Sequence, residues 1–159
     1  MLTTDSLQRI DREIAKYPPD RKQSAVMSAL TIAQDEKGWL STETMDYVAQ
    51  YLGMAPVAVY EVATFYTMYN LKPVGRHKLT VCTCLPCGLQ GSLAAADHLR
   101  ARLGIDFNQT TPDGRFTLRT VECYGGCGWG PVVSVDERYH EPCGPDQVEG
   151  ILRELRGNA

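Results

Sequence analysis

Five of the six cysteines in this sequence stand in two clusters whose spacing suits metal binding. Cys82, Cys84 and Cys87 fall within six residues of "VCTCLPCG", and Cys123 and Cys127 follow in "ECYGGCGWG". Four thiolates complete either a tetrahedral zinc site or an iron–sulfur cluster, so one of the five is surplus. The spacing favours a two-iron cluster, because two metal centres tolerate wider spacing than the two tight knuckles of a single zinc site.

Two other interpretations of the cysteines remain open from spacing alone. Cys84-Leu85-Pro86-Cys87 matches a C-x-x-C dithiol redox motif placed before a helix, but this leaves Cys123 and Cys127 without a role. A zinc-stabilised interaction module without redox activity is the alternative from a different functional class. The sixth cysteine, Cys143, lies outside both clusters, and we expect a partly buried or surface thiol there.

The elements around the cysteines predict how the two clusters meet. "KLTVCT" is a β-rich run that enters the first cluster, and "RFTLRTVEC" alternates like a strand and ends at Cys123. A helix is expected over "LQGSLAAADHLRARLG", a buried strand over "PVVSV" and a final amphipathic helix over "GPDQVEGILREL". Neighbouring strands would bring the two cysteine loops together at one edge of the domain. Gly125, Gly126, Gly128 and Gly130 let the second loop wrap closely around a cluster, with amide N–H groups pointing at its sulfurs.

The first 70 residues predict four helices that pack as a small bundle. Asp20 is the expected N-cap of the second helix, and Pro56 fits the first turn of the fourth. One narrow packing seam cannot bury all the aromatic surface of Phe65, Tyr66 and Tyr69, so we expect these side chains also to face a partner. "NLKPVGRH" looks like a hinge. We therefore expect a helical, partner-docking region at 1–72 and an α/β domain at 73–159.

Composition narrows the function further. The net charge of −3 and the pI near 5.6 argue against a nucleic-acid or anionic-membrane surface. No apolar run is long enough to insert into a membrane, and the first residues carry no signal core, so a cytoplasmic or otherwise reducing location is expected. In such a compartment, clustered cysteines are more often metal ligands or redox thiols than disulfides. No dinucleotide or Walker-type loop is present, and His77, His98 and His140 are scattered.

The motifs around the cysteines resemble one family closely. "VCT-x-x-x-CG-x-x-G" followed by "VEC-x-G-x-CG-x-x-PVV" is similar to the thioredoxin-like [2Fe-2S] ferredoxin subunit of NADH dehydrogenases, in the NADH-oxidising module of respiratory complex I. "EVATFYTMY" and "NQTTPDGRFTLRTVEC" extend the resemblance from about Leu7 to Leu155. The implied fold is α+β, a helical bundle at 1–72 followed by a thioredoxin-like α/β ferredoxin domain at 73–159.

The resemblance also implies a site and a function. The family's cluster ligands fall on Cys82, Cys87, Cys123 and Cys127 of this sequence. The chain would be an electron-transfer subunit of NADH:quinone oxidoreductase with one [2Fe-2S] cluster and no substrate site of its own. FMN and NADH would bind a partner flavoprotein, linked in turn to further iron–sulfur subunits on the cytoplasmic side of a bacterial inner membrane or the matrix side in an organelle. The alternative is the equivalent subunit of an NAD-reducing hydrogenase or an NAD-dependent formate dehydrogenase.

Cys84 departs from the family's pattern, which more usually has a polar residue such as Asn at that position. Its thiol would either tune the cluster, offer a substitute ligand or simply fill space. We expect the last of these.

Overall fold

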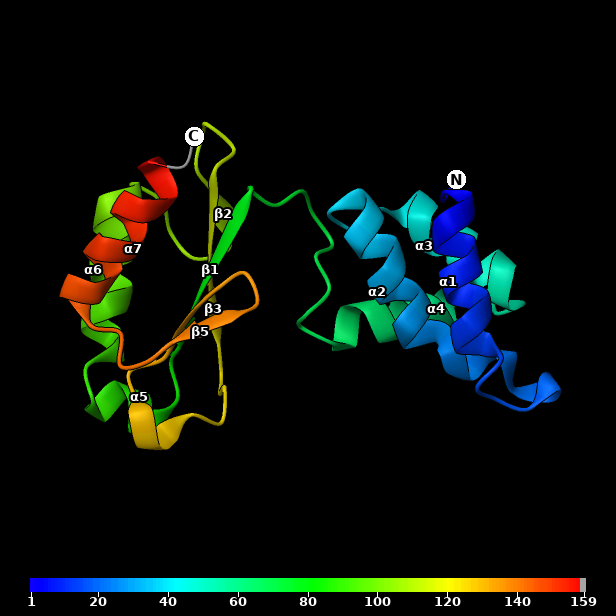
Figure 1. The fold of residues 1–159 in the computed structure, drawn as a ribbon, viewed down its shortest axis with the longest axis horizontal. Helices are drawn as coiled ribbons and strands as arrows, with labels where there is room; N and C mark the ends of the chain where they lie inside the picture. Colours follow the sequence, from blue (N-terminus) through cyan, green and yellow to red (C-terminus); the bar gives the residue numbers. More distant parts are fainter. Residues whose placement is uncertain (158–159) are drawn as a thin grey trace. The chain divides into compact units, whose positions relative to one another are not determined.

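The structure, a computed structural model, describes residues 1–157. The chain divides into two compact units, one from Met1 to Pro73 and the other from Val74 onward. Figure 1 shows helices alone in the first unit, and helices with a sheet in the second. This confirms the expected fold class, a helical bundle followed by an α/β domain. None of the helices described is long and apolar enough to cross a membrane.

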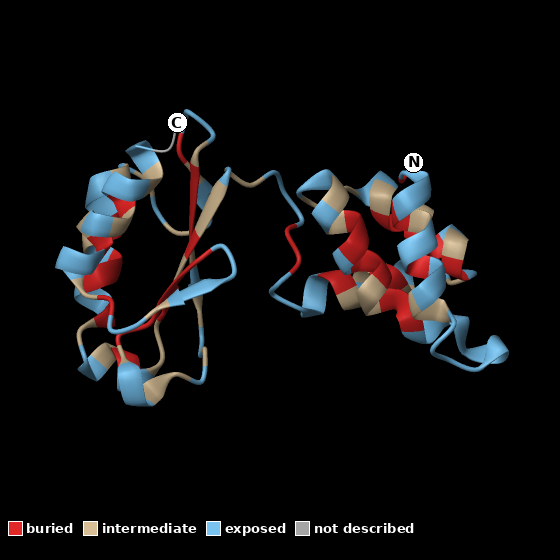
Figure 2. Cartoon of the chain, in the orientation of Figure 1, coloured by how far each residue is buried: buried red, intermediate tan, exposed pale blue. Residues whose placement is uncertain are grey.

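The first unit is built from four α-helices and one 3-10 helix. They are α1 (Thr4–Ile14), η1 (Pro19–Ala25), α2 (Val26–Lys37), α3 (Thr42–Leu52) and α4 (Pro56–Phe65). Each α-helix contributes to one apolar core, with Ile10, Leu30, Val48 and Val59 among its fully buried side chains. Figure 2 shows these buried faces turned toward one another. The bundle is therefore held by ordinary amphipathic packing.

Two expectations about this unit are wrong in part. Asp20 does not cap α2, because the prolines before it start a 3-10 helix that runs to Ala25, and α2 begins only at Val26. Tyr69 is buried, with 3% of its surface exposed, and its hydroxyl donates to the Met27 carbonyl oxygen at 3.0 Å. Phe65 and Tyr66, by contrast, are exposed, Phe65 by 76%.

A polar contact fixes the start of the bundle to α2. The backbone N–H and the hydroxyl of Thr3, the N-cap of α1, both donate to Glu36 Oε2 at 2.9 Å. Hydrogen bonds from Lys37, then from Ser6 and Thr3, lower the pKa of the Glu36 carboxyl to about 2. The carboxylate therefore satisfies N–H and O–H donors at a helix start that would otherwise depend on water.

The second unit contains a five-stranded sheet and three α-helices. Its elements in chain order are β1 (His77–Cys82), α5 (Leu85–Leu89), α6 (Ser92–Leu103), β2 (Gln109–Thr110), β3 (Phe116–Val121), η2 (Cys127–Trp129), β4 (Val133–Val135), β5 (Arg138–His140) and α7 (Pro145–Gly157). The strand order is β2-β3-β1-β4-β5. β1 and β3 are parallel neighbours, whereas the other pairs are antiparallel.

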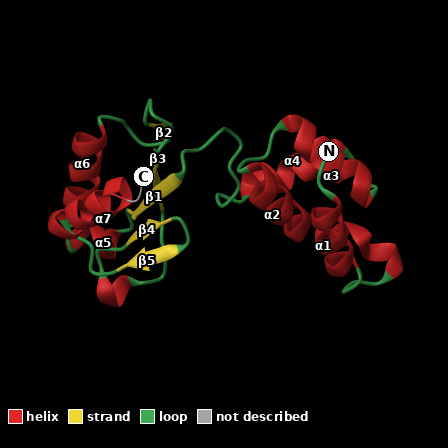
Figure 3. Cartoon of the chain, turned by 45° about the horizontal axis from the view of Figure 1, so that its top comes forward, coloured by secondary structure: helices red, strands yellow, loops and turns green. Residues whose placement is uncertain are grey.

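The two long helices of this unit lie on the same side of the sheet (Figures 1 and 3). Leu79 of β1 and Leu118 of β3 are register partners, and both pack in one core with Leu99 of α6 and Leu152 of α7. The helix expected over 89–104 is α6, which begins only at Ser92 because Gly91 before it takes a φ of +97°. A separate helix that was not expected, α5, precedes it. The short helix α5 therefore belongs to the first cysteine loop.

Candidate metal centre

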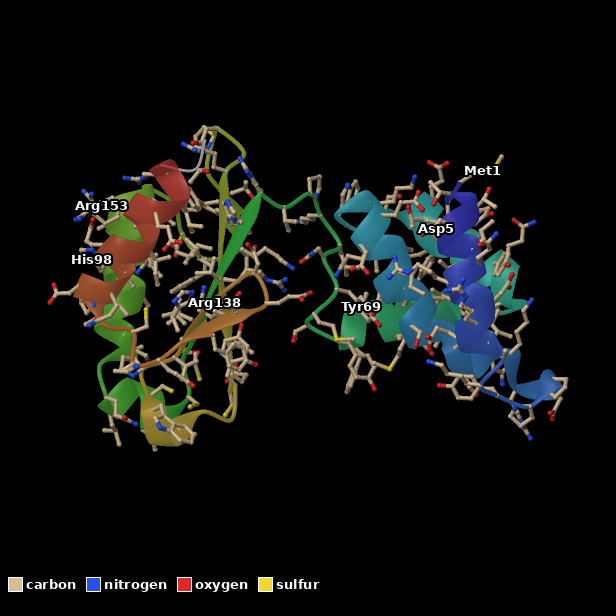
Figure 4. All side chains as sticks on the ribbon, in the orientation of Figure 1. Met1, Asp5, Tyr69, His98, Arg138 and Arg153 are labelled. Carbon is tan, nitrogen blue, oxygen red and sulfur yellow. The ribbon has the colours of Figure 1, made fainter. Side chains whose placement is uncertain are left out.

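The two cysteine loops leave the sheet side by side. Cys82 ends β1 and is the register partner of Val121, which ends β3, and the two strands are parallel. Because parallel strands run the same way, their carboxyl ends and following loops meet at one edge. Thr83 crosses between them, and its N–H donates to the Val121 carbonyl oxygen at 3.0 Å. The structure thus confirms that the loops meet, and Figure 4 shows sulfur atoms gathered at this end, beside α5.

The sulfur atoms of five cysteines lie in two overlapping groups. Cys82, Cys84 and Cys87 form one group and Cys84, Cys123 and Cys127 the other, with every sulfur in a group within 4.8 Å of the rest. The two pairs that the family resemblance selects therefore lie at one site. Cys84, the residue left out of that selection, belongs to both groups.

The two loops differ in how deeply they hold their thiols. Cys82 and Cys87 are each 1% exposed and pack on fully buried Val132, forming a small apolar cluster. Cys123 is exposed and Cys127 is half-buried. One side of the centre is therefore embedded in the domain, and the other side is open to solvent.

Backbone N–H groups point at the sulfurs, as expected for a cluster-binding loop. Gly125, whose φ of +76° suits glycine, donates its N–H to Cys123 Sγ at 3.2 Å. Burial raises the pKa of the Cys82 thiol, but N–H groups of Cys84 and Tyr124 and the neighbouring thiols outweigh it, and the net pKa is lowered. The same donors stabilise negative charge on sulfur, which a reduced iron–sulfur cluster carries.

The pKa values of the two neighbouring thiols, Cys84 and Cys87, are shifted upward instead. The Cys87 N–H lowers the pKa of Cys84, but the hydrogen bond with Cys82 and desolvation raise it further, to about 12. Desolvation first, and then the Cys82 side chain, raise the pKa of Cys87. The hydrogen bonds within this loop therefore lower the pKa of Cys82 while they and desolvation raise the pKa of its two neighbours.

One side chain ties the two loops together, and no pattern in the sequence predicted it. Gln90 Nε2 donates to the Pro86 carbonyl oxygen at 3.1 Å and to the Cys127 carbonyl oxygen at 3.0 Å. A Cβ on Gly130 would lie 2.9 Å from that nitrogen, so glycine leaves room for the amide. Both partners of Gln90 are backbone atoms, one of them 37 residues away, and residue types and spacing carry no signal of such a contact.

A partly buried contact supports the strand beside the centre. The Tyr124 hydroxyl and the Ser134 Oγ lie 2.6 Å apart, and Ser134 is buried in β4. The Tyr124 ring also packs on Tyr139 of β5, with centroids 4.7 Å apart. Tyr124, the residue after Cys123, thus anchors the start of the second loop.

The donors present fit a [2Fe-2S] cluster. Both groups consist only of cysteines, and soft thiolates suit zinc or iron–sulfur centres rather than magnesium or calcium. A single zinc with bonds of about 2.3 Å to four sulfurs would draw all of them to roughly 3.8 Å from one another. Across residues 1–157 no set of four sulfurs lies within a common 4.8 Å. Two sulfur groups offset from each other favour two metal centres over one.

The other candidate residues lie away from the centre. Cys143 is fully buried in the core between the sheet and α7, so the expectation of a partly buried or surface thiol is wrong; burial raises its pKa to about 11. His98 Nε2 lies 2.9 Å from Glu149 Oε1 and so joins α6 to α7 (Figure 4). His77 Nδ1 contacts Asp136 in the same manner. His140, on β5, belongs to neither sulfur group.

Comparison with known proteins places these loops in a family. The family model for the thioredoxin-like [2Fe-2S] ferredoxin matches residues 10–156. The chain belongs to this ferredoxin family. The resemblance seen in the cysteine motifs is thereby confirmed over nearly the whole chain.

Curated relatives of this ferredoxin carry consistent names. The chain is 43% identical over 146 residues to an NADH-quinone oxidoreductase subunit of Rickettsia bellii, covering 91% of this chain and 87% of the relative. It is 45% identical over 149 residues to an NADH-quinone oxidoreductase subunit of Rhizobium meliloti, covering 94% and 88%. It is also 38% identical to mitochondrial NADH dehydrogenase [ubiquinone] flavoprotein 2 of Dictyostelium discoideum, covering 98% of this chain and 64% of that one.

Among solved structures, the ferredoxin resembles part of an NAD⁺-reducing [NiFe]-hydrogenase in the air-oxidised state. The TM-score is 0.71 with 17% sequence identity, over 81% of this chain and 23% of the hydrogenase chain. The ferredoxin thus spans about a quarter of that longer chain. At this identity the likeness establishes a shared fold.

Proposed function

We propose that this ferredoxin is the electron-transfer subunit of the NADH-oxidising module of NADH:quinone oxidoreductase. It would hold one [2Fe-2S] cluster and exchange single electrons with FMN on a partner flavoprotein that binds NADH. The observation that supports this most directly is the juxtaposition of five thiols from two strand-end loops in a chain so closely related to NADH-quinone oxidoreductase subunits. The complex would lie on the cytoplasmic side of a bacterial inner membrane, or on the matrix side in an organelle.

The proposed ligands are Cys82, Cys87, Cys123 and Cys127, as the family resemblance assigns them. A bound cluster supplies one-electron exchange, and the protein's own contribution is to hold it and set its surroundings. Cys82 and Cys87 sit in the apolar cluster with Val132, which excludes water from that side. In the second loop, the Gly125 N–H donates to Cys123 Sγ, and the Gln90 amide of the first loop donates to the Cys127 carbonyl oxygen.

The same end of the second unit presents apolar side chains to solvent. Leu85 and Leu89 of α5 and Trp129 of η2 are exposed beside the cysteine loops. Exposed apolar groups around an electron-transfer centre suit contact with a partner protein. In the first unit, Phe65, Tyr66 and Met68 are exposed at the end of α4, which fits the proposed docking role of residues 1–72.

Metal analysis of anaerobically purified protein tests the cluster. We expect iron and acid-labile sulfide in equal amounts, and an EPR signal that appears on reduction. One zinc per chain without sulfide would instead support the zinc-stabilised interaction module and would overturn the proposal.

Ligand identity is tested by serine variants one at a time. Cys84→Ser should leave the EPR signal of the reduced cluster intact, whereas Cys82, Cys87, Cys123 or Cys127 to Ser should alter or remove it. Loss of the cluster in Cys84→Ser alone would show that the first pair is wrongly assigned.

The partner is tested by purification of the intact complex from its source. We expect an FMN-containing flavoprotein together with membrane subunits of a quinone reductase. Recovery with a hydrogenase or a molybdenum subunit would support the alternative assembly, and a chain that binds no flavoprotein would contradict both.

A further inference from the structure

Cys84 occupies the centre of the thiol site. Its sulfur lies within 4.8 Å of Cys82 and Cys87 on one side and of Cys123 and Cys127 on the other. Its distance to Cys82 Sγ is 3.5 Å. A residue that merely filled space would have no need of a sulfur within reach of all four others.

The backbone around Cys84 also suits metal binding. Cys84 is the extended residue before α5, with φ −61° and ψ 156°, and Cys87 lies in the first turn of that helix. The Gly88 N–H donates to the Cys84 carbonyl oxygen at 2.8 Å, which fixes this turn. Two residues separate Cys84 from Cys87, and this is the spacing with which paired cysteines usually bind one metal.

Cys82 is nevertheless better placed than Cys84 to act as a ligand in the wild-type protein. It ends β1, its N–H donates to the Val132 carbonyl oxygen at 3.0 Å, and its side chain is almost fully buried. Cys84 is half-buried in the loop that follows. A ligand fixed by a strand loses less conformational freedom on binding than one in a loop, so Cys82 is preferred while it is present.

We propose that Cys84 is a reserve ligand, which pairs with Cys87 on the same iron when Cys82 is lost. This rests on the proposed ligand set. In the exchange, the Cys84 thiol releases its proton to solvent and forms an iron–sulfur bond where the Cys82 sulfur would have bound. The number of thiolate ligands, the iron and sulfide content and the charge of the cluster all stay the same.

The test compares four variants of the full chain, each reconstituted anaerobically with iron and sulfide. They are Cys82→Ala, Cys84→Ala, Cys82→Ala/Cys84→Ala and the control Cys82→Ala/Cys143→Ala, which removes the cysteine outside both groups. We expect Cys82→Ala and its control to keep iron and sulfide near the wild-type content, with altered EPR g-values. The Cys82→Ala/Cys84→Ala protein should lose the cluster.

Alkylation gives a second readout that does not depend on cluster yield alone. In the wild-type protein Cys84 is half-exposed and would hold no iron, so prolonged treatment with iodoacetamide at alkaline pH should label it, as mass spectrometry of its peptide would show. The labelling should be slow, because the raised pKa of Cys84 leaves little of the reactive thiolate. In cluster-loaded Cys82→Ala the same residue should be protected. The Cys82→Ser background provides the same comparison with a side chain closer in size to cysteine.

Two results would overturn the proposal while leaving the proposed function intact. One is cluster loss in both Cys82→Ala and Cys82→Ser as complete as in the double variant. The other is a loaded Cys82→Ala protein in which Cys84 is labelled as in the wild type. Loss of the cluster in Cys84→Ala alone would overturn the ligand set itself.

Discussion

Gln90 offers a sharp test of how the centre is held. We consider Gln90→Met, which keeps the length of the side chain and removes both N–H donors. Only the bond to the Cys127 carbonyl oxygen joins the two loops, because Pro86 and Gln90 belong to the same loop. One such hydrogen bond at an exposed position contributes about 0.5–1 kcal/mol to closing the second loop on the first. That free energy corresponds to a population of opened loops about 2–5 times larger.

The assay is the rate at which an iron chelator in excess removes iron from the loaded protein under anaerobic conditions. When loops open and close quickly, this rate follows the population of the open form. Gln90→Met should therefore lose iron about 2–5 times faster than the wild type. Gln8→Met, at an exposed position of α1, is the matched control and should not change the rate. A rate for Gln90→Met equal to that of the Gln8→Met control would refute the idea that Gln90 joins the loops.

Three further changes test neighbouring contacts. Gly130→Ala should displace the Gln90 amide and raise the iron-release rate, with no additional increase in the Gln90→Met background, whereas additive effects would contradict a shared contact. Tyr124→Phe should lower the free energy of unfolding in urea by about 1–3 kcal/mol, because it leaves the buried Ser134 hydroxyl without its partner; an unchanged value would refute this. The folded-state pKa of Glu36 is below its ordinary 4.5, so its carboxylate stabilises the fold at neutral pH and less so as pH falls toward 2. The urea midpoint of Glu36→Gln should therefore lie below the wild type at pH 7 and approach it in acid, and a difference independent of pH would contradict this origin.

The cysteine loops show what a sequence can predict about such a site. Alternation and turn residues identified the strands that lead into Cys82 and Cys123, and the expectation that these strands are neighbours predicted that their loops meet. The structure adds that the two strands are parallel and that β3 ends at Val121, before Cys123. The helix α5 escaped prediction because five residues with a proline and a glycine carry no helical period. Gln90 escaped because its partners are backbone atoms, one of them distant in the chain. The burial of Cys143 was not predicted because a free cysteine can pack in a core as a small apolar residue, and residue type alone does not show whether it does.

The first unit shows the same limit in another form. The apolar stripes predicted four helices, and the glycines Gly38 and Gly53 end α2 and α3 in the left-handed region, as their positions indicate. The aromatic run at the end of α4 predicted more exposure than it has. Tyr69 turns inward because its ring packs in the bundle core while its hydroxyl finds the Met27 carbonyl oxygen, and an amphipathic side chain can satisfy both demands only in a particular tertiary setting.

The unequal burial of the two loops suggests how retention of the cluster and electron exchange are divided between them. Cys82 and Cys87 lie against Val132 in the interior, so changes there would disturb packing and the ability to keep a cluster. Cys123 is exposed and Trp129 is exposed just beyond it, so a partner that contacts the second loop would approach the centre with little protein between. Changes on that loop's surface should therefore alter the reduction potential, and contact with the proposed flavoprotein, more than cluster content, because solvent exposure and hydrogen bonds to sulfur set the potential.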